Sequence, residues 1–514
     1  MPSPRRPPSP IPITIPPASP GSWRTACWRL TAACPLGSAR ARYSGAAAEP
    51  DPSRHWHLRR RVELEGALDL ERRIDAIVGE YVDPGGPGLS VLAGRDDRVL
   101  VHKGYGRADV AGGQAITPRS RFVIGSVTKQ FTAVAVMLLR HRGRLTYDDP
   151  AARWLPELPD WAARVTLRQL LHHTGGVREY LDEAFWTAAA AGKYPDLASL
   201  LELIASLGDL EFEPGTRWRY SNSGYVLLGA AVERASGQTF ASFLRDNVFI
   251  PLGMDHTLVG ESDERPAGLA TGYRYRGKDD YELAPWHFAV IGWADGNVIS
   301  TTGDLFRWSQ SLYTSRLLPL EALAEAIVPC RPLDPAFSRY GFGQLMGERR
   351  GVREVHHGGG TLGFVSALNR FPDERLTIVL LSNAAGIELA DITGRVAEAC
   401  LGDRLAPLVA ASLGSGDLEE KRGTYLGTPR GETVRVTVRN STGGGLEAAV
   451  EHGEESPGAP PVPKWHYLLA VSRDLFLMNP HADVYLHFIR EGTGVAGARL
   501  LAGGAVQEFA RQDA

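Results

Sequence analysis

The segment Phe122–Leu139 constrains this chain more than any other. Ser126 and Lys129 stand three residues apart, and an almost wholly apolar run follows them up to Arg140. Residues at positions i and i+3 of a helix are neighbours on one face, so a helix that starts at Ser126 places the lysine amine beside the serine hydroxyl. Because the apolar run from Phe131 onward has no polar face, it predicts a helix that is buried on all sides.

A hydroxyl beside an amine in a partly dry site is the arrangement of an activated nucleophile. The amine can take the hydroxyl proton, and the free N–H groups at the start of a helix suit a developing oxyanion. Ser-x-x-Lys alone is a weak signal, because on many helices such a pair is a capping serine and a solvated lysine. The functional interpretation therefore depends on residues later in the chain.

Length and composition limit the class of protein. The 514 residues are 43% hydrophobic with a formal net charge of −3, which supports two or three domains and gives no basic field for nucleic acid. No apolar run reaches the roughly 18 to 20 residues of a membrane-spanning helix. The four cysteines are scattered and match no zinc pattern, so we expect no bound metal and no disulfide framework.

Residues 1–67 differ in composition from the rest. They are rich in proline and arginine and hold no acidic residue before Glu49, which predicts a disordered or extended segment. Three interpretations stay open: a leader peptide, an organelle transit segment and an over-long gene start. The sequence leaves the location open, and because no clear signal peptide is present it favours the cytoplasm over a secreted or periplasmic location.

Two folded regions follow. In residues 68–412, strand pairs near 88–104 and 365–382 enclose a mainly helical segment, which indicates a mixed α/β domain. A Gly- and Ser-rich linker precedes residues 413–514, where short strand-like runs at regular spacing predict a small all-β domain, either a sandwich or a barrel.

Further candidate residues lie in turns. Tyr220 and Asn222 stand in a loop that leads into a predicted helix over 225–235, although a buried tyrosine is more often a core residue with one hydrogen bond. His357 opens a glycine-rich strand end that continues to Gly360, and glycines let a strand edge come close to a ligand because they carry no Cβ.

The adjacent residues His172 and His173 could suggest a metal site. Neighbouring side chains diverge on a helix, and no carboxylate or third histidine has ligand spacing. We therefore interpret both as structural histidines.

Taken together, Ser126-Val-Thr-Lys129, Tyr220-Ser-Asn222 and His357-Gly-Gly359 resemble, in order, the motifs of the serine β-lactamase and penicillin-binding-protein superfamily. The resemblance is to the class C-like branch, which also holds D-peptidases and esterases, and it covers roughly residues 70 to 405. It implies an α/β fold: a β-lactamase-like sandwich of an antiparallel sheet, drawn from both ends of the domain, with flanking helices and a helical subdomain. The trailing all-β unit resembles the accessory domain of many such hydrolases.

The resemblance also implies roles for individual residues. Ser126 would be the acylated nucleophile, and Lys129 and Tyr220 would share proton transfer. Asn222 would hold the substrate amide and Lys129. The N–H groups of Ser126 and Gly360 would form the oxyanion hole, next to Gly359 in the substrate-binding strand.

The third motif departs from that of true β-lactamases. His357 stands where they carry lysine, and Gly358 where they carry a hydroxyl; both of those groups normally hold the substrate carboxylate. An imidazole with a reference pKa of about 6.5 holds an anion weakly at pH 7, so strong β-lactamase activity is not expected. If His357 titrates near neutrality, carboxylate binding should strengthen as the pH falls. Gly175, where the family usually has serine, is expected to change only a turn.

We therefore expect a cofactor-free serine hydrolase that acts through an acyl-enzyme on ester or amide bonds. Carboxylesterase and D-aminoacyl peptidase are the leading alternatives, with weak β-lactamase activity third. A penicillin-recognising sensor that is acylated without efficient turnover is the alternative class. The expected partner is a small-molecule or peptide substrate, without nucleic acid or a transmembrane segment. The substrate itself and the oligomeric state are left open.

Overall fold

The computed structural model describes most of the chain from residue 66 onward. The described residues are 66, 68–181, 185, 196–260, 265–284, 293–330, 339–428, 433–442, 444–452, 465–479, 484–502 and 505–512. The N-terminal segment 1–65, and with it the leader, transit and gene-start interpretations, lies outside them. Within these ranges, no helix combines the length and the apolar character needed to cross a bilayer.

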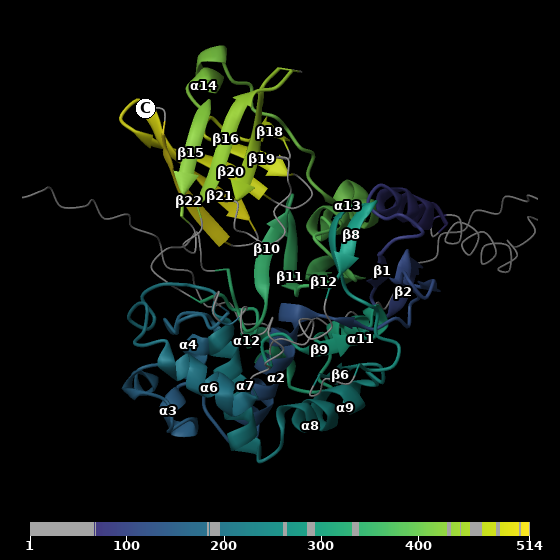
Figure 1. Cartoon of the computed structure of the whole chain (residues 1–514), viewed down its shortest axis with the longest axis vertical. Helices are drawn as coiled ribbons and strands as arrows, with labels where there is room; N and C mark the ends of the chain where they lie inside the picture. Colours follow the sequence, from purple (N-terminus) through teal and green to yellow (C-terminus); the bar gives the residue numbers. More distant parts are fainter. Residues whose placement is uncertain are drawn as a thin grey trace, which may run out of the picture. The chain divides into compact units, whose positions relative to one another are not determined.

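A six-stranded antiparallel sheet forms the centre of the first region, in the order β10-β11-β12-β13-β1-β2 (Figure 1). Its strands are β1 (Leu89–Arg95), β2 (Arg98–Tyr105), β10 (Leu345–Arg349), β11 (Val352–Gly360), β12 (Val365–Phe371) and β13 (Leu376–Ser382). Both predicted hairpins form, β1 with β2 and β12 with β13. Because β1 also pairs with β13, with Leu89 opposite Ser382, the sheet takes strands from both ends of the region, as expected.

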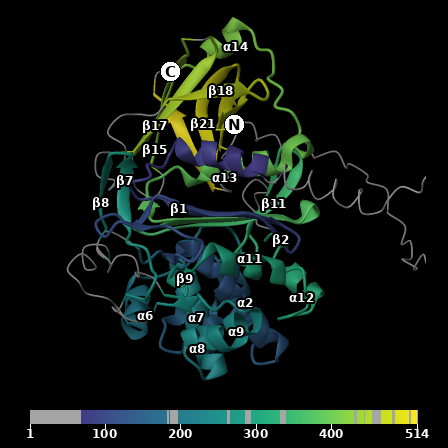
Figure 2. The ribbon, with the colours of Figure 1, turned by 90° about the vertical axis from the view of Figure 1, so that its right-hand side faces the viewer.

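Helices cover both faces of this sheet. Figure 2 shows α13 (Leu389–Leu401) on one side, and α11 (Thr302–Ser311) with the helical region on the other. On the α13 side, apolar residues of the helix over 68–79, such as Ile74, pack with Val91 and Val396 in one core. All seven residues of β13 are buried, which is the pattern of a strand that is covered on both faces.

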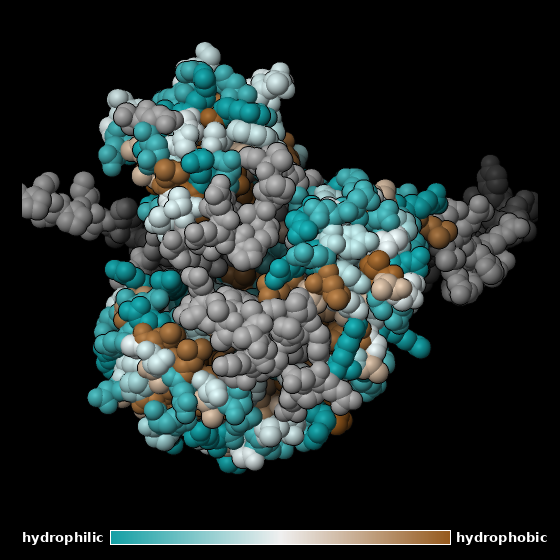
Figure 3. Space-filling view, in the orientation of Figure 1, coloured by the Kyte–Doolittle hydropathy of each residue, from teal (hydrophilic) through white to brown (hydrophobic). Residues whose placement is uncertain are grey.

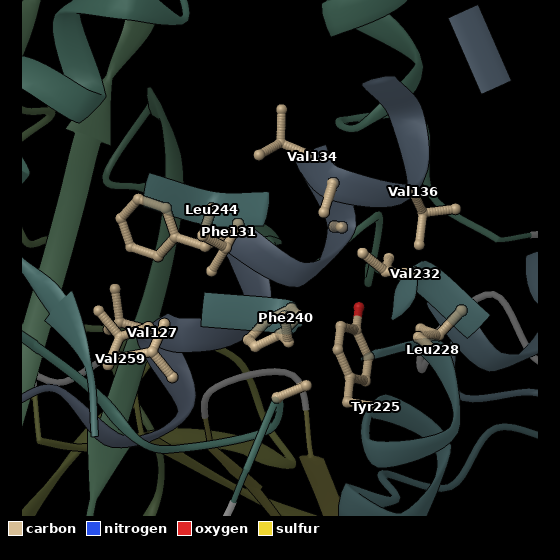
Figure 4. Close-up of a cluster of buried hydrophobic side chains, with 14 of the residues drawn as sticks. Val127, Phe131, Val134, Val136, Tyr225, Leu228, Val232, Phe240, Leu244 and Val259 are labelled. Carbon is tan, nitrogen blue, oxygen red and sulfur yellow. The ribbon is translucent and has the colours of Figure 1, made fainter. Parts of the chain in front are cut away.

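The helical region lies between the two halves of the sheet in sequence. Its helices are α2 (Thr128–His141), α3 (Ala151–Trp154), α4 (Leu167–Leu171), α6 (Leu197–Ser206), α7 (Asn222–Ser236), α8 (Phe240–Leu244), α9 (Ile250–Leu252) and α12 (Leu320–Glu325). Every residue of α2 from Thr128 to Leu139 is buried, as predicted. Figure 4 shows Phe131 and Val134 of α2 in one apolar cluster with Leu228 of α7. This packing makes α2 a rigid support for the side chains of its first turn, Lys129 among them.

Short strands connect the sheet to the helical region. They are β3 (Arg107–Asp109), β4 (Gln114–Ala115), β5 (Phe122–Val123), β6 (Leu258–Val259), β7 (Tyr273–Gly277), β8 (Asp280–Leu283), β9 (Val298–Ser300) and β14 (Ala384–Ala385). β9 pairs with both β5 and β6. Since β5 directly precedes Ser126, this pairing fixes the chain that enters the nucleophile segment.

The C-terminal region closes into an eight-stranded barrel, one of the two predicted architectures. A short helix, α14 (Ser415–Glu419), precedes the strands β15 (Gly423–Gly427), β16 (Val434–Asn440), β17 (Leu446–His452), β18 (His466–Ala470), β19 (Leu475–Asn479), β20 (Val484–Glu491), β21 (Gly494–Ala502) and β22 (Ala505–Arg511). Pairing of β15 with β22 closes the barrel, and Tyr425, Phe476, Phe488 and Phe509 fill its interior. Hydrophilic side chains predominate on the faces visible in Figure 3.

Candidate active site

Ser126 lies in a 3₁₀ turn, η1 (Gly125–Val127), that runs directly into α2. The α-helix therefore begins two residues later than the sequence suggested. The predicted neighbourhood forms all the same, because Lys129 Nζ lies 3.1 Å from Ser126 Oγ.

The end of β11 packs directly against this turn. A Cβ at Gly359 would lie 2.0 Å from the Ile124 carbonyl oxygen and 2.9 Å from Ser126 N. Gly125, at φ +50°, is equally crowded, since its Cβ would lie 2.6 Å from Gly360 N. Only glycine permits such an approach, so the main-chain N–H groups of Ser126 and Gly360 lie on adjoining segments.

Lys129 is completely buried. Its Nζ donates to Ser126 Oγ at 3.1 Å, to Asn222 Oδ1 at 2.6 Å and to the main-chain oxygen of Asp295 at 2.9 Å. These three neutral oxygens satisfy all the donors of the amine. Within the described ranges, no carboxylate lies within ion-pair distance of Lys129. Two aromatic rings also lie near Nζ, those of Tyr220 and Tyr225, with centroids at 4.8 and 5.5 Å.

Asn222, the first residue of α7, is held by Glu179. One carboxylate oxygen of Glu179 accepts from the Asn222 main-chain N–H at 2.8 Å and from its Nδ2 at 3.2 Å. Because Nδ2 is engaged there, Oδ1 faces Lys129. Burial raises the pKa of Glu179 above its usual value. Sequence reasoning missed this residue, because a lone glutamate in a loop carries no periodic or motif signal.

Asp295 contributes through its main chain. Its carboxylate accepts from Tyr180 Oη at 3.0 Å and from the Trp293 N–H at 2.8 Å, which holds the turn so that its carbonyl oxygen meets Lys129. Any residue type supplies a carbonyl oxygen, so the sequence gives no sign of this contact.

The two adjacent histidines make different kinds of contact. His172 Nδ1 contacts the main-chain oxygen of Tyr340 at 3.1 Å, while the His173 ring packs on the rings of Tyr220 and Tyr340, with centroids 4.3 and 4.5 Å away. No group of three or more histidine, cysteine or acidic side chains in the described part of the chain is arranged to hold a metal ion.

His357 is buried, with 4% of its surface exposed. Its Nδ1 donates to the carbonyl oxygen of Gly358 at 2.6 Å, so its Nε2 accepts from the Tyr340 hydroxyl at 2.9 Å. Burial lowers the pKa of His357 to about 3. The expectation that His357 titrates near neutrality is therefore wrong: a ring desolvated on β11, with both nitrogens bonded, stays neutral and has no free nitrogen for an anion.

Comparison with known proteins identifies the family. The family model described as Beta-lactamase matches residues 74–402. Similar relatives include penicillin-binding protein 4* of Bacillus subtilis (strain 168), 34% identical over 308 residues, which cover 57% of this chain and 67% of the relative. D-aminopeptidase of Gluconobacter oxydans (strain 621H) is 28% identical over 322 residues, 61% of this chain and 58% of the relative.

A solved structure of D-amino acid amidase from Ochrobactrum anthropi SV3, complexed with L-phenylalanine amide, superposes with a TM-score of 0.58. It is 26% identical and covers 65% of this chain and 99% of the amidase. The chain belongs to the β-lactamase family. The expected family, fold class and reaction class, a serine hydrolase related to β-lactamases, are confirmed. The chain spans only 58% of the length of the Gluconobacter relative.

Proposed function

We propose that this protein cleaves amide bonds of small D-amino acid amides or peptides through an acyl-enzyme at Ser126. The observation that carries the proposal is the buried Lys129, whose Nζ lies 3.1 Å from Ser126 Oγ and whose hydrogen bonds within the described part of the chain all go to neutral oxygens. An amine in such surroundings is suited to exchange a proton with the hydroxyl instead of forming an ion pair.

The three hydrogen bonds of Lys129 Nζ are those of the protonated amine, so acylation requires Lys129 first to release one proton to water. As the neutral amine it then takes the proton of Ser126 while Oγ attacks the substrate carbonyl carbon. The oxyanion that forms is held by the N–H groups of Ser126 and Gly360, which the glycine packing at Gly125 and Gly359 brings onto adjoining segments. Removal of one such donor typically lowers kcat by about 100- to 1000-fold.

Tyr220 completes the proton path. As the C–N bond breaks, the proton passes from Lys129 through the Tyr220 hydroxyl to the leaving amine, and the ring of Tyr220 lies 4.8 Å from Lys129 Nζ. Water then attacks the acyl carbon, releases the acid and restores Ser126. Asn222 keeps Lys129 in place through Oδ1, at 2.6 Å, while one hydrogen of its Nδ2 bonds Glu179 and the second can bond the substrate.

The substrate class follows from the third motif. Where true β-lactamases hold a carboxylate with lysine, this chain has His357, whose nitrogens are bonded to Tyr340 and Gly358. Because the described residue at this position, His357, offers no cation, the site favours substrates that lack a carboxylate there, such as amino acid amides. The relatives named D-aminopeptidase and D-amino acid amidase support the choice of D-amino acid amides.

The test is labelling and turnover with a fluorophosphonate and the p-nitroanilides of D- and L-phenylalanine. We expect one label on the peptide that contains Ser126, none in Ser126→Ala, and a kcat/KM at least about tenfold higher for the D substrate. Labelling without turnover of any amide would support the sensor alternative. A Ser126→Ala protein that took the label on the same peptide would overturn the proposal.

A further inference from the structure

His173 stands in a backbone conformation that few residues adopt. Its φ is +60°, in the left-handed region where asparagine, aspartate and histidine are the more tolerated non-glycine residues. The main-chain oxygen of His173 accepts from the Arg219 N–H at 2.9 Å, and that of Thr174 accepts from the Gly215 N–H at 2.8 Å. The turn after α4 is thus bonded to the loop that carries Tyr220.

The side chain of His173 binds the same loop. Its Nδ1 accepts from the Ser221 N–H at 3.1 Å. The residues on both sides of Tyr220, Arg219 and Ser221, are therefore hydrogen-bonded to one histidine. The imidazole also packs on the Tyr220 ring, with centroids 4.3 Å apart and an angle of 36° between the planes. His173 thus fixes both the main chain and the ring of Tyr220.

The protonation of His173 matches this contact. Because Nδ1 accepts a hydrogen bond, the proton of the neutral ring is on Nε2, and Nε2 is buried with no partner among the described residues. Burial, and secondarily the charge of Lys129, hold the pKa of His173 well below its usual value. An unpartnered N–H destabilises the fold, and an apolar ring would avoid that cost. What the imidazole adds is the acceptor that holds Ser221.

From these contacts we infer that His173 is the positioning residue that aims the Tyr220 hydroxyl at the leaving amine. The inference rests on the proposed function, in which Tyr220 donates that proton. His172 supplies a matched control: it is also buried, at 8% exposure, but it contacts the main-chain oxygen of Tyr340 and packs on Phe342 at 4.9 Å.

Two variants of the full-length protein separate the contributions of His173. His173→Asn keeps an acceptor and tolerates the left-handed backbone but removes the ring, and His173→Phe keeps a ring but removes the acceptor. A misplaced proton donor should lower kcat for the p-nitroanilide of D-phenylalanine by about 10- to 100-fold, with little change in KM. The matching p-nitrophenyl ester, whose leaving group needs no proton, should change less than about threefold.

His172→Asn should lower the melting temperature but reduce amide and ester turnover equally, by no more than about twofold. Melting temperatures of all variants identify the folded ones, and either His173 variant alone suffices for the test. Equal losses on amide and ester in a folded His173 variant would overturn the inference, as would a loss on the amide no larger than that of His172→Asn. If the wild type takes no fluorophosphonate label, the proposed function fails first, and the inference fails with it.

Discussion

Among the described residues, the two folded regions each bury one lysine completely, and the two lysines have opposite kinds of neighbour. The hydrogen bonds that the structure describes for Lys129 in the helical region all go to neutral oxygens. Lys421 in the barrel region lies 2.9 Å from a carboxylate oxygen of Glu420 and 3.4 Å from one of Asp474. Its Nζ also lies 5.8 Å from the ring centroid of Phe476.

The difference shows that burial does not by itself mark a catalytic lysine. Carboxylates neutralise the charge of Lys421, and Arg490 joins the same cluster, where its hydrogen bonds lower the pKa of both Glu420 and Asp474. In this cluster the charge of Lys421 is compensated by carboxylates, which are not groups that a lysine activates as nucleophiles by taking a proton. Lys129 instead contacts a hydroxyl that can lose its proton, so its neighbours, and not its exposure, indicate chemistry.

The largest effect should come from Lys129→Met, which preserves the buried volume but removes the amine. Loss of a residue that acts as one unit with the nucleophile should lower kcat for the D-phenylalanine p-nitroanilide by about 10⁴-fold or more. Tyr220→Phe should also cost several orders of magnitude, and the double variant little more than either. Additive losses in this double-mutant cycle would show that Lys129 and Tyr220 do not share a proton path.

Lys421→Met should change stability and leave catalysis intact. Removal of one partner from a buried ion cluster leaves charge uncompensated. Since Arg490 stays in the cluster and the carboxylates are partly exposed, we expect a loss of about 2 kcal/mol in the free energy of unfolding, measured with urea, and not the larger cost of a fully buried pair. If kcat of the folded variant falls more than about threefold, the two regions are coupled and the comparison between the lysines is wrong.

A third comparison separates the two regions by the pH dependence of their stability. Burial lowers the pKa of His172 to about 4 and that of His357 to about 3. The unfolded chain binds these protons near pH 6.5 and the folded chain does not, so each contribution is complete above about pH 6.5 and is lost as the pH falls toward the folded value. The expected slope is at most about 1.4 kcal/mol per pH unit for each histidine.

The barrel cluster should respond at lower pH, because its carboxylates have lowered pKa values and protonate only below their usual range. As the pH is lowered from 7 to 5, the region of the sheet and helices should therefore lose thermal stability before the barrel does. His357→Gln, which cannot titrate, should reduce that slope by the share of one histidine, because burial also lowers the pKa of His172, His173 and His356. A wild-type slope equal to that of the variant would contradict the neutral, buried state of His357.

Local patterns predicted the parts of the site that depend on residue type and spacing. Ser126 and Lys129 could be paired because helical geometry fixes their separation, and the buried α2 followed from its unbroken apolar run. Tyr220, Asn222 and Gly360 entered only through the order of motifs. The structure brings all of these residues to one place, while their individual roles stay predictions.

What the sequence could not predict depends on contacts between distant segments. In the sequence His173 looks like any other turn residue, because its contact with the loop around Tyr220 forms only in the folded chain. In the same way, Glu179 can hold Asn222 only because the fold brings the start of α7 beside it. The protonation of His357 depends on its burial beside Tyr340, so the reference pKa of histidine led to a wrong expectation for this residue. In the barrel, β15 and β22 carry a weak strand signal, because Gly423 and Gly427 and the weakly apolar run at 505–511 break the alternation that identifies strands.

The pairing of β1 with β13 also has a consequence for synthesis of the chain. The strand that starts the sheet at Leu89 finds a partner that ends at Ser382, and β11, which completes the surroundings of Ser126, comes from Val352–Gly360. At about 5 to 20 residues per second, the interval between Ser126 and the last of these strands lasts on the order of ten to fifty seconds. The nascent chain therefore contains Ser126 long before the surrounding site is complete. A chain whose synthesis ends before β13 lacks the strand that pairs with β1, and we expect it to be inactive.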